Sequence, residues 1–244
     1  MRNMSKLQQK TSNRPAATPL TRERIIDTIG CFVPLFIYGV IYWTWFWRLE
    51  RTNHLHYHVI HSSLDDLIPF AEIFIVPYYA WFIYVSFTIL FFLFKYDLED
   101  YIRLSFFLCS GMTVFLVVST LWPNIQYLRP AVMPRDNIFT HMVANLYATD
   151  TPTNIWPSIH VYNSIGAHIA ISGSKRFSPW MKRCSFVMAT LIILSTMFLK
   201  QHSVLDVVAA FVMALVFYAL TYRSEWAPAL AQRHYERRSA GAAQ

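Results

Sequence analysis

Long apolar segments separated by short polar connections dominate this chain. Each segment is close to the roughly 20 residues that an α-helix needs to cross a membrane. Only six glycines occur, and the apolar segments are long, which favours helices over a transmembrane barrel. Six membrane spans are predicted, at residues 25–47, 67–94, 104–122, 157–174, 184–200 and 203–222. The fourth is the most polar, since it contains His160, Asn163 and His168.

The composition points to the same class of protein. Of the 244 residues, 55% are hydrophobic and only 14% are charged, whereas a soluble domain has about 25% charged residues. The three cysteines lie in or beside apolar segments and form no Cys-x-x-Cys motif, which indicates core residues. We therefore predict an all-α, polytopic membrane protein. Its expected parts are a disordered basic tail (1–24), a six-helix membrane domain (25–222) and a second basic tail (223–244).

The basic residues predict how the chain is oriented. Sixteen of the 21 Lys and Arg residues lie in the two tails and in the second and fourth connections. The positive-inside rule places these segments, and hence both termini, in the cytoplasm. The net charge of +7 reflects mostly this bias, so it does not indicate nucleic-acid binding. The expected partners are membrane lipids, including anionic headgroups near the tails.

A histidine and a carboxylate lie close together on the predicted outer side. His202 and Asp206 are four residues apart, so on a helix they share one face. Asp206 could then hold one ring nitrogen of His202 and leave the other available as a nucleophile. The alternative is a structural pair. Ionisable residues in membrane segments are costly and more often functional, which favours the first interpretation.

A second group of polar residues opens the fourth segment, at Pro157-Ser158-Ile159-His160. Proline suits the first turn of a helix, and the amides at a helix N-terminus favour an anion. The Ser158 hydroxyl adds a donor, and His160 could protonate a leaving alkoxide. The alternative is a capped helix with an interfacial histidine. Arg129, in the outer connection at 123–156, could bind two phosphate oxygens or be an ordinary loop arginine.

Taken together, these motifs resemble the type 2 phosphatidic acid phosphatase superfamily. Its pattern is Lys-x6-Arg-Pro, Pro-Ser-x-His and Ser-Arg-x5-His-x3-Asp. The matching residues span about 120–210 and are Arg129-Pro130, Pro157-Ser158-Ile159-His160, Ser195, His202 and Asp206. The resemblance implies a two-step reaction without metal or other cofactor.

The resemblance also implies a role for each residue. His202 would attack phosphorus, Asp206 would orient it, and His160 would protonate the leaving oxygen and then activate the acceptor. Arg129, Ser158 and the amide of Ile159 would hold the phosphate oxygens. These roles agree with the chemistry expected from the residues themselves.

Three positions depart from the family pattern. Trp122 stands where the family has Lys, Thr196 stands where it has Arg, and Ile159 replaces the usual Gly. Because a phosphate dianion needs more than one positive partner, we expect Arg135 or Lys200 to enter the site. Arg135 is favoured for its planar guanidinium. Ser195 and Thr196 complete the predicted phosphate-binding set.

The expected function is a lipid phosphate phosphatase acting on a phosphatidic acid-like or polyprenyl phosphate. Its site would face outward from the plasma (inner) membrane. The third motif also resembles inositol phosphorylceramide synthases, and sphingomyelin synthases share its His-x3-Asp element, so a lipid phosphotransferase remains an alternative. A transporter or scaffold that inherited the fold is a third.

Other polar residues receive structural interpretations. His54, His56, His58 and His61 fit a polar interfacial loop better than a metal site. His168 lies two turns after His160, either supporting it or buried in the core. Glu72 is expected either to pair with His168 or to lie at the interface.

Overall fold

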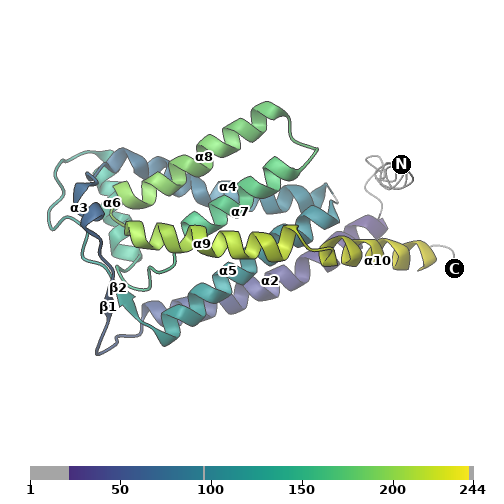
Figure 1. The fold of residues 1–244 in the computed structure, drawn as a ribbon, viewed down its shortest axis with the longest axis horizontal. Helices are drawn as coiled ribbons and strands as arrows, with labels where there is room; N and C mark the ends of the chain where they lie inside the picture. Colours follow the sequence, from purple (N-terminus) through teal and green to yellow (C-terminus); the bar gives the residue numbers. More distant parts are fainter. Residues whose placement is uncertain (1–21, 96, 242–244) are drawn as a thin grey trace.

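The computed structural model describes residues 22–95 and 97–241, and almost all of the regular structure in them is helical. Five helical segments are long and apolar enough to cross a membrane: Arg24–Glu50, Glu72–Phe94, Leu98–Leu121, Pro179–Phe198 and Val204–Tyr222. They run side by side along the long axis of the molecule (Figure 1). The protein is therefore an all-α, multi-pass membrane protein. Exposed apolar side chains such as Ile37, Val212 and Leu215 suit contact with lipid.

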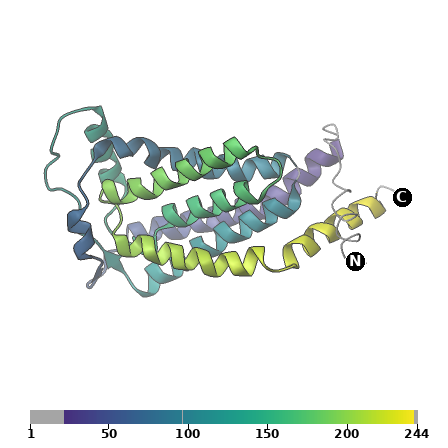
Figure 2. The same ribbon diagram turned by 45° about the horizontal axis from the view of Figure 1, so that its top comes forward.

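The long helices form one bundle, which a second view also shows (Figure 2). Its members are α2 (Arg22–Glu50), α4 (Ile75–Phe94), α5 (Leu98–Leu121), α7 (Ile159–Gly173), α8 (Pro179–Phe198) and α9 (Val204–Tyr222). Helix α7 contacts α4, α5, α8 and α9 and is the most enclosed of the six. The beginning of α2 and helix α10 (Trp226–Gly241) lie at the same end of the bundle (Figure 1).

Short elements gather at the other end of the bundle (Figure 1). They are β1 (His58–Val59), α3 (Ser63–Leu67), the 3-10 helix η1 (Glu72–Phe74), β2 (Asn124–Ile125) and α6 (Ile138–Thr149). The two strands pair in parallel, with His58 opposite Asn124. The outer connection predicted at 123–156 is thus partly ordered into β2 and α6, which its polar sequence did not indicate.

The fourth predicted span differs most from expectation. Helix α7 has 15 residues, or about 22 Å at 1.5 Å per residue, against a hydrocarbon core of about 30 Å. It is not among the five helices that could cross by length and composition. Its polar Asn163 and Ser164 are buried against neighbouring helices. Enclosure by protein explains why this helix can be both short and polar.

Several predicted helix boundaries were wrong. The second span was predicted to begin at residue 67, but α3 ends there and α4 begins only at Ile75. Pro69 in the break disfavours continuous helix. The fifth helix begins at Pro179 because Ser178 caps it and proline suits the first turn. The third helix also begins earlier than predicted, at Leu98 instead of residue 104.

The two predicted tails have different outcomes. Residues 1–21, most of the expected N-terminal tail, lie outside the described residues. The expected C-terminal tail contains helix α10, which packs against α5. Its buried Ala227 and Ala231 provide the contact face.

Close packing between α5 and α7 fixes the centre of the bundle. The rings of Phe107 and Tyr162 are stacked with centroids 4.4 Å apart, and the Tyr162 hydroxyl donates to the Phe107 carbonyl at 2.8 Å. Two glycines permit this approach. A Cβ on Gly111 would overlap the Tyr162 ring, and one on Gly166 would lie 2.6 Å from Phe107 Cδ1.

We therefore expect Gly111→Ala to lower the free energy of unfolding by about 1–3 kcal/mol through overpacking. The measurement is the melting temperature of the purified protein in detergent. Gly39→Ala is the matched control, because a Cβ there meets nothing within 4 Å. It should leave stability unchanged or raise it slightly. Equal melting temperatures for the two variants would contradict this packing.

Candidate active site

His202 and Asp206 form a buried pair at the start of α9. His202 Nδ1 lies 3.2 Å from Asp206 Oδ2, with exposed side-chain fractions of 9% and 0%. The residues meet as predicted, but not by sharing a helix face. Ser203 is the N-cap of α9, so His202 precedes the helix and the Asp206 carboxylate bends back to it. The same oxygen accepts the Ser203 amide at 2.8 Å, so a capping box positions the pair.

The turn between α8 and α9 directs His202 into this position. Lys200 has a φ of +53°, in the left-handed region that is uncommon outside glycine and asparagine. The amides of Gln201 and His202 both donate to the carbonyl of Thr196 at 3.0 Å. This pattern ends α8 and starts the turn that leads to His202.

Asp65 on α3 supports the same helix start, and the sequence analysis missed it. Its carboxylate accepts hydrogen bonds from the Ser203 hydroxyl at 2.6 Å and the Val204 amide at 2.7 Å. It also accepts the Ser62 amide at 2.8 Å. The Ser62–Asp65 capping box was visible in the sequence as a helix start, but nothing in the sequence linked it to a segment 138 residues away.

His160 lies on the second residue of α7 and faces the pair. Its ring centroid is 4.6 Å from that of Tyr78, 4.4 Å from that of Trp81 and 5.8 Å from that of His202. The N-cap of α7 is Ser158, so Pro157 precedes the helix and does not occupy its first turn as predicted. The Ser158 amide donates to the Asp206 carbonyl at 3.4 Å, which ties the two helix starts together. His160 Nδ1 is buried with no partner among the described residues, so it can bond to a ligand.

Arg129 bonds to Gln201, the residue that precedes His202. Its Nη2 donates to Gln201 Oε1 at 2.5 Å and to the Thr151 carbonyl at 3.1 Å. The guanidinium lies 4.4 Å from the centroid of the Tyr147 ring. Burial lowers the pKa of Arg129, whereas the nearby carboxyl of Asp150 raises it. Arginine stays charged in proteins, so this is a fixed cation bonded to the residue before His202.

Asp150 is a second residue that the sequence analysis did not single out. It ends α6, and its Oδ2 accepts the Tyr78 hydroxyl at 3.4 Å. Burial raises the pKa of Asp150, while Arg129 and His202 oppose that shift. A charged Asp150 would repel a phosphate at Arg129, whereas the protonated acid would not.

The two candidate replacement cations have partners elsewhere. Arg135 Nη1 lies 2.5 Å from Glu72 Oε2, and its side chain is 59% exposed. The Lys200 ammonium donates to the carbonyls of Asp65 and Ile68. Burial lowers the pKa of Lys200, and Asp65 and Asp66 oppose this. Their entry into a phosphate complex stays a prediction.

The remaining predicted phosphate ligands are Ser195, Thr196 and Ile159. The hydroxyls of Ser195 and Thr196 are buried and donate to carbonyls of their own helix, at 2.6 and 2.8 Å. Ile159 is the first residue of α7, where the amide lacks a carbonyl partner within the helix. Trp122 stacks on His58 with ring centroids 4.7 Å apart.

Glu72 does not pair with His168, contrary to one of the two expectations for it. Glu72 binds Arg135 and Asn137, whereas His168 Nδ1 lies 3.0 Å from the Ser185 hydroxyl. His168 is therefore a hydrogen-bonded residue between α7 and α8. Of the outer-loop histidines, His61 pairs with Asp66 and His58 stacks on Trp122.

Because Asp150 is a buried acid, we expect Asp150→Asn to change how vanadate binding depends on pH. Since the folded-state pKa of Asp150 is raised, its stabilising contribution is present below its unfolded-state pKa and is lost as pH rises through the folded value. Above its folded-state pKa, the negative charge of Asp150 also repels an anion bound at Arg129. Calorimetry should show wild type losing vanadate affinity, relative to Asp150→Asn, as the pH rises. Parallel affinity profiles for the two proteins would contradict a role for this carboxyl near the anion.

Comparison with known proteins adds no relative from which to transfer a function. The chain matches no protein-family model, no curated protein and no solved structure. The assignment of this site therefore depends on its own residues: a buried His–Asp pair, a second histidine facing it, and a fixed arginine.

Proposed function

We propose that the protein is an integral-membrane lipid phosphate phosphatase of the type 2 phosphatidic acid phosphatase kind. One observation carries the proposal: the buried His202–Asp206 pair faces His160, with the rings 5.8 Å apart, beside the fixed charge of Arg129. A nucleophile with an orienting carboxylate, an acid–base group and an anion partner are the parts that phosphoryl transfer through a covalent intermediate needs.

The first step is transfer of the phosphoryl group to the protein. Asp206 holds Nδ1 of His202, which leaves Nε2 to attack phosphorus. The new N–P bond forms as the bond from phosphorus to the lipid oxygen breaks. His160, in its protonated form, gives its proton to that oxygen, and the lipid alcohol leaves.

The second step restores the protein. Neutral His160 removes a proton from water, and the hydroxide oxygen attacks phosphorus as the N–P bond breaks. Phosphate leaves, and His160 is protonated for the next cycle. Arg129 and the amides at the start of α7 stabilise the negative charge on the phosphoryl oxygens in both steps.

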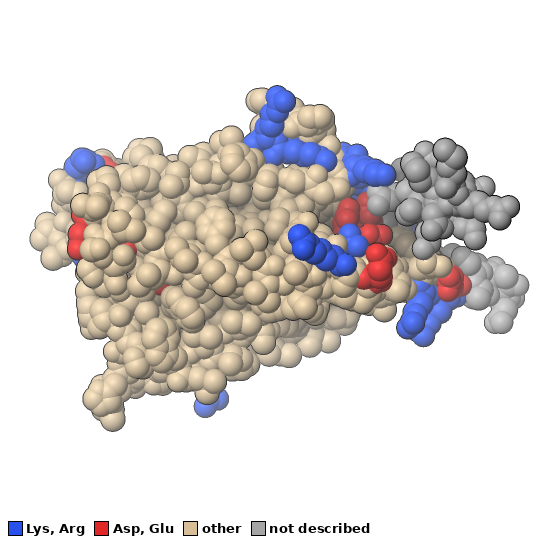
Figure 3. Space-filling model, in the orientation of Figure 1, with Lys and Arg blue, Asp and Glu red and all other residues tan. Residues whose placement is uncertain are grey.

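The membrane arrangement follows from the charge pattern. On the face in view, Lys and Arg side chains gather toward the end of the bundle that carries α10, and few lie at the end that carries α3 and α6 (Figure 3). The positive-inside rule then places α10 and the start of α2 in the cytoplasm. The six bundle helices give six crossings, with α7 the short, protein-enclosed one. The site lies at the outer face of the plasma membrane, within reach of lipid headgroups.

A phosphotransferase is the second candidate, and one observation favours it. Arg129 is the only cation at a family position, and Arg135 and Lys200 are bound to other groups. Weaker phosphate binding would suit a reaction in which a second lipid or alcohol takes the phosphorylated headgroup. The chemistry of His202 and His160 is the same in both cases, and only the acceptor differs.

The nucleophile can be tested with p-nitrophenyl phosphate, whose stable phenolate leaving group needs no proton. His160→Ala should still release one equivalent of the phenol and then retain phosphate on His202, because the second step lacks its base. His202→Ala should release none. Acid-labile phosphate on the protein, located by mass spectrometry, is the measurement.

His168→Ala is the matched control, because this histidine lies on the same helix and bonds to Ser185 instead of the pair. It should keep kcat/KM within about twofold of wild type. Full turnover in His202→Ala would overturn the mechanism, and so would stable phosphate on any other residue.

Acceptor exchange separates the phosphatase from the phosphotransferase. With a radiolabelled lipid phosphate in detergent, we expect free phosphate to be the main product. Adding excess diacylglycerol, ceramide or a short alcohol should not divert the label. If the label moves mainly to an added acceptor, the protein is a phosphotransferase that uses the same two histidines.

A further inference from the structure

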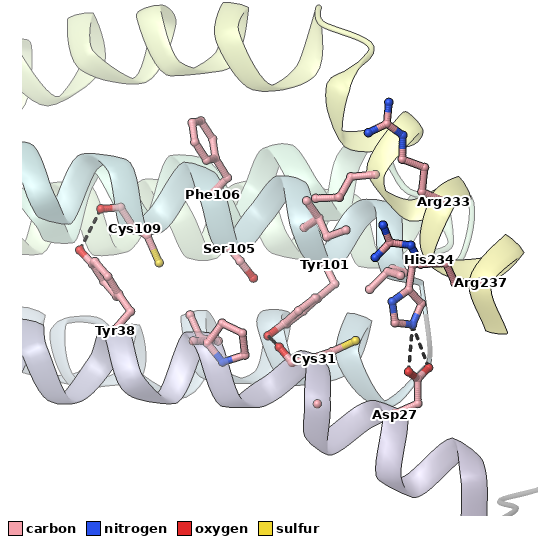
Figure 4. Close-up of a pocket in the computed structure, with 16 residues that line it drawn as sticks. Asp27, Cys31, Tyr38, Tyr101, Ser105, Phe106, Cys109, Arg233, His234 and Arg237 are labelled. Atoms are coloured by element: carbon pink, nitrogen blue, oxygen red, sulfur yellow. Dashed lines mark hydrogen bonds and ion pairs between the residues drawn. The ribbon is translucent and has the colours of Figure 1, made fainter. Parts of the chain in front are cut away.

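A second cluster of reactive side chains joins the first and last described helices. Asp27 and Cys31 lie four residues apart on α2, and His234 lies on α10. His234 Nε2 is 2.9 Å from Asp27 Oδ1 and 3.1 Å from Oδ2. One ligating atom from each of the three residues lies within 4.8 Å of the others. Figure 4 shows the Cys31 sulfur on the side of α2 that faces His234 and Asp27.

The cluster borders a cavity at the α10 end of the bundle, away from His202. The cavity has a volume of about 730 Å³ and lies between α2, α5 and α10. Its walls are mostly apolar, and its polar end holds the cluster together with Arg233 and Arg237 (Figure 4). The three cluster residues are each neither fully buried nor fully exposed.

The donor set fits zinc. Carboxylate oxygen, thiolate sulfur and imidazole nitrogen are its usual protein ligands, at about 2.0–2.3 Å. An oxygen and a nitrogen ligand in such a tetrahedron are about 3.3 Å apart by the same geometry, slightly more than the hydrogen-bonded 2.9 and 3.1 Å between His234 and Asp27. The Cys31 sulfur lies within 4.8 Å of the other two ligand atoms and would move closer on binding, and water would take the fourth position.

The charges also balance. An aspartate, a thiolate and a neutral imidazole sum to two negative charges, which one Zn²⁺ neutralises. The bound site would therefore add no net charge beside Arg233 and Arg237. Binding deprotonates the Cys31 thiol and releases that proton to solvent.

We propose that Asp27, Cys31 and His234 bind one Zn²⁺ that fastens α10 to α2 at the cytoplasmic end of the bundle. The site stands apart from the phosphoryl-transfer residues and does not depend on their function. Because metal binding to the folded state stabilises it by mass action, zinc should raise the melting temperature.

The experiment uses full-length protein with any affinity tag removed, treated with EDTA and exchanged into metal-free detergent buffer. His54, His56, His58 and His61 are replaced by Gln in every sample, so that the outer loop cannot bind the probe. Zn²⁺ titration should then show one equivalent bound and a higher melting temperature. Co²⁺ should produce a thiolate-to-cobalt absorption band in the near ultraviolet.

Single ligand variants and matched controls decide the outcome. Asp27→Asn, Cys31→Ser and His234→Gln should each weaken binding more than about tenfold, since even changes to groups around a metal cost 10–100-fold. Cys31→Ser should also abolish the cobalt band. Cys184→Ser, at an exposed cysteine on α8, and His168→Gln should bind like the parent.

No zinc binding by the parent, or binding unchanged in all three ligand variants, would overturn the proposal. The melting curve identifies any variant that does not fold. In that case the cobalt spectra of the other two variants provide the test. The same titration on His202→Ala should give wild-type binding, so failure of the zinc site and failure of the phosphatase proposal are distinguishable. EDTA should lower the melting temperature while phosphoryl transfer persists.

Discussion

Two buried carboxylates, Asp65 and Asp206, hold the start of α9 and with it the candidate nucleophile. Asp206 accepts the Ser203 amide and contacts His202, while Asp65 accepts the Ser203 hydroxyl and the Val204 amide. Leaving a buried hydrogen-bonding group without its partner costs about 1–3 kcal/mol, and more for a charged group. The helix N-terminus supplies the amides and the positive end of the dipole that both carboxylates need. The position of His202 is therefore fixed by the hydrogen bonds that these buried carboxylates require inside an apolar bundle.

The same constraint explains the short helix α7. Its first residues meet the Asp206 carbonyl, and its polar side chains are enclosed by α4, α5, α8 and α9. Close packing of Phe107 on Tyr162, permitted by Gly111 and Gly166, keeps α7 at the centre. His160 is carried on this rigid helix against Tyr78 and Trp81. A site built on the ends of packed helices holds its groups more firmly than one built on loops.

The candidate site combines one fixed cation with a buried acid. Arg129 is the fixed positive charge, and Asp150 is a buried acid near it whose pKa is raised by burial. Arg135 pairs with Glu72 and so holds the loop of residues 130–137. Lys200 donates to the carbonyl of Asp65 and so holds helix α3. Where the motif resemblance predicts Lys and Arg, Trp122 stacks on His58 and the carbonyl of Thr196 accepts the amides of the turn before His202. Such a site has less positive charge than the motif pattern implies. Its charge therefore does not decide between water and a second lipid as the phosphoryl acceptor.

Apolar run length determined the all-α membrane class, because each backbone polar group in lipid must be paired within a helix. Motif spacing brought His160, His202, Asp206 and Arg129 to attention. In the structure His202 contacts Asp206, its ring lies 5.8 Å from that of His160, and Arg129 bonds to Gln201. The geometry of the His–Asp pair could not be read from spacing, since Ser203 caps α9 and puts His202 outside it. Asp65, Tyr78, Trp81 and Asp150 were missed because they reach the site from distant segments, and no local pattern encodes such contacts. The tertiary structure alone decided these neighbours, along with the meeting of Asp27, Cys31 and His234, because helix packing sets which side chains face one another.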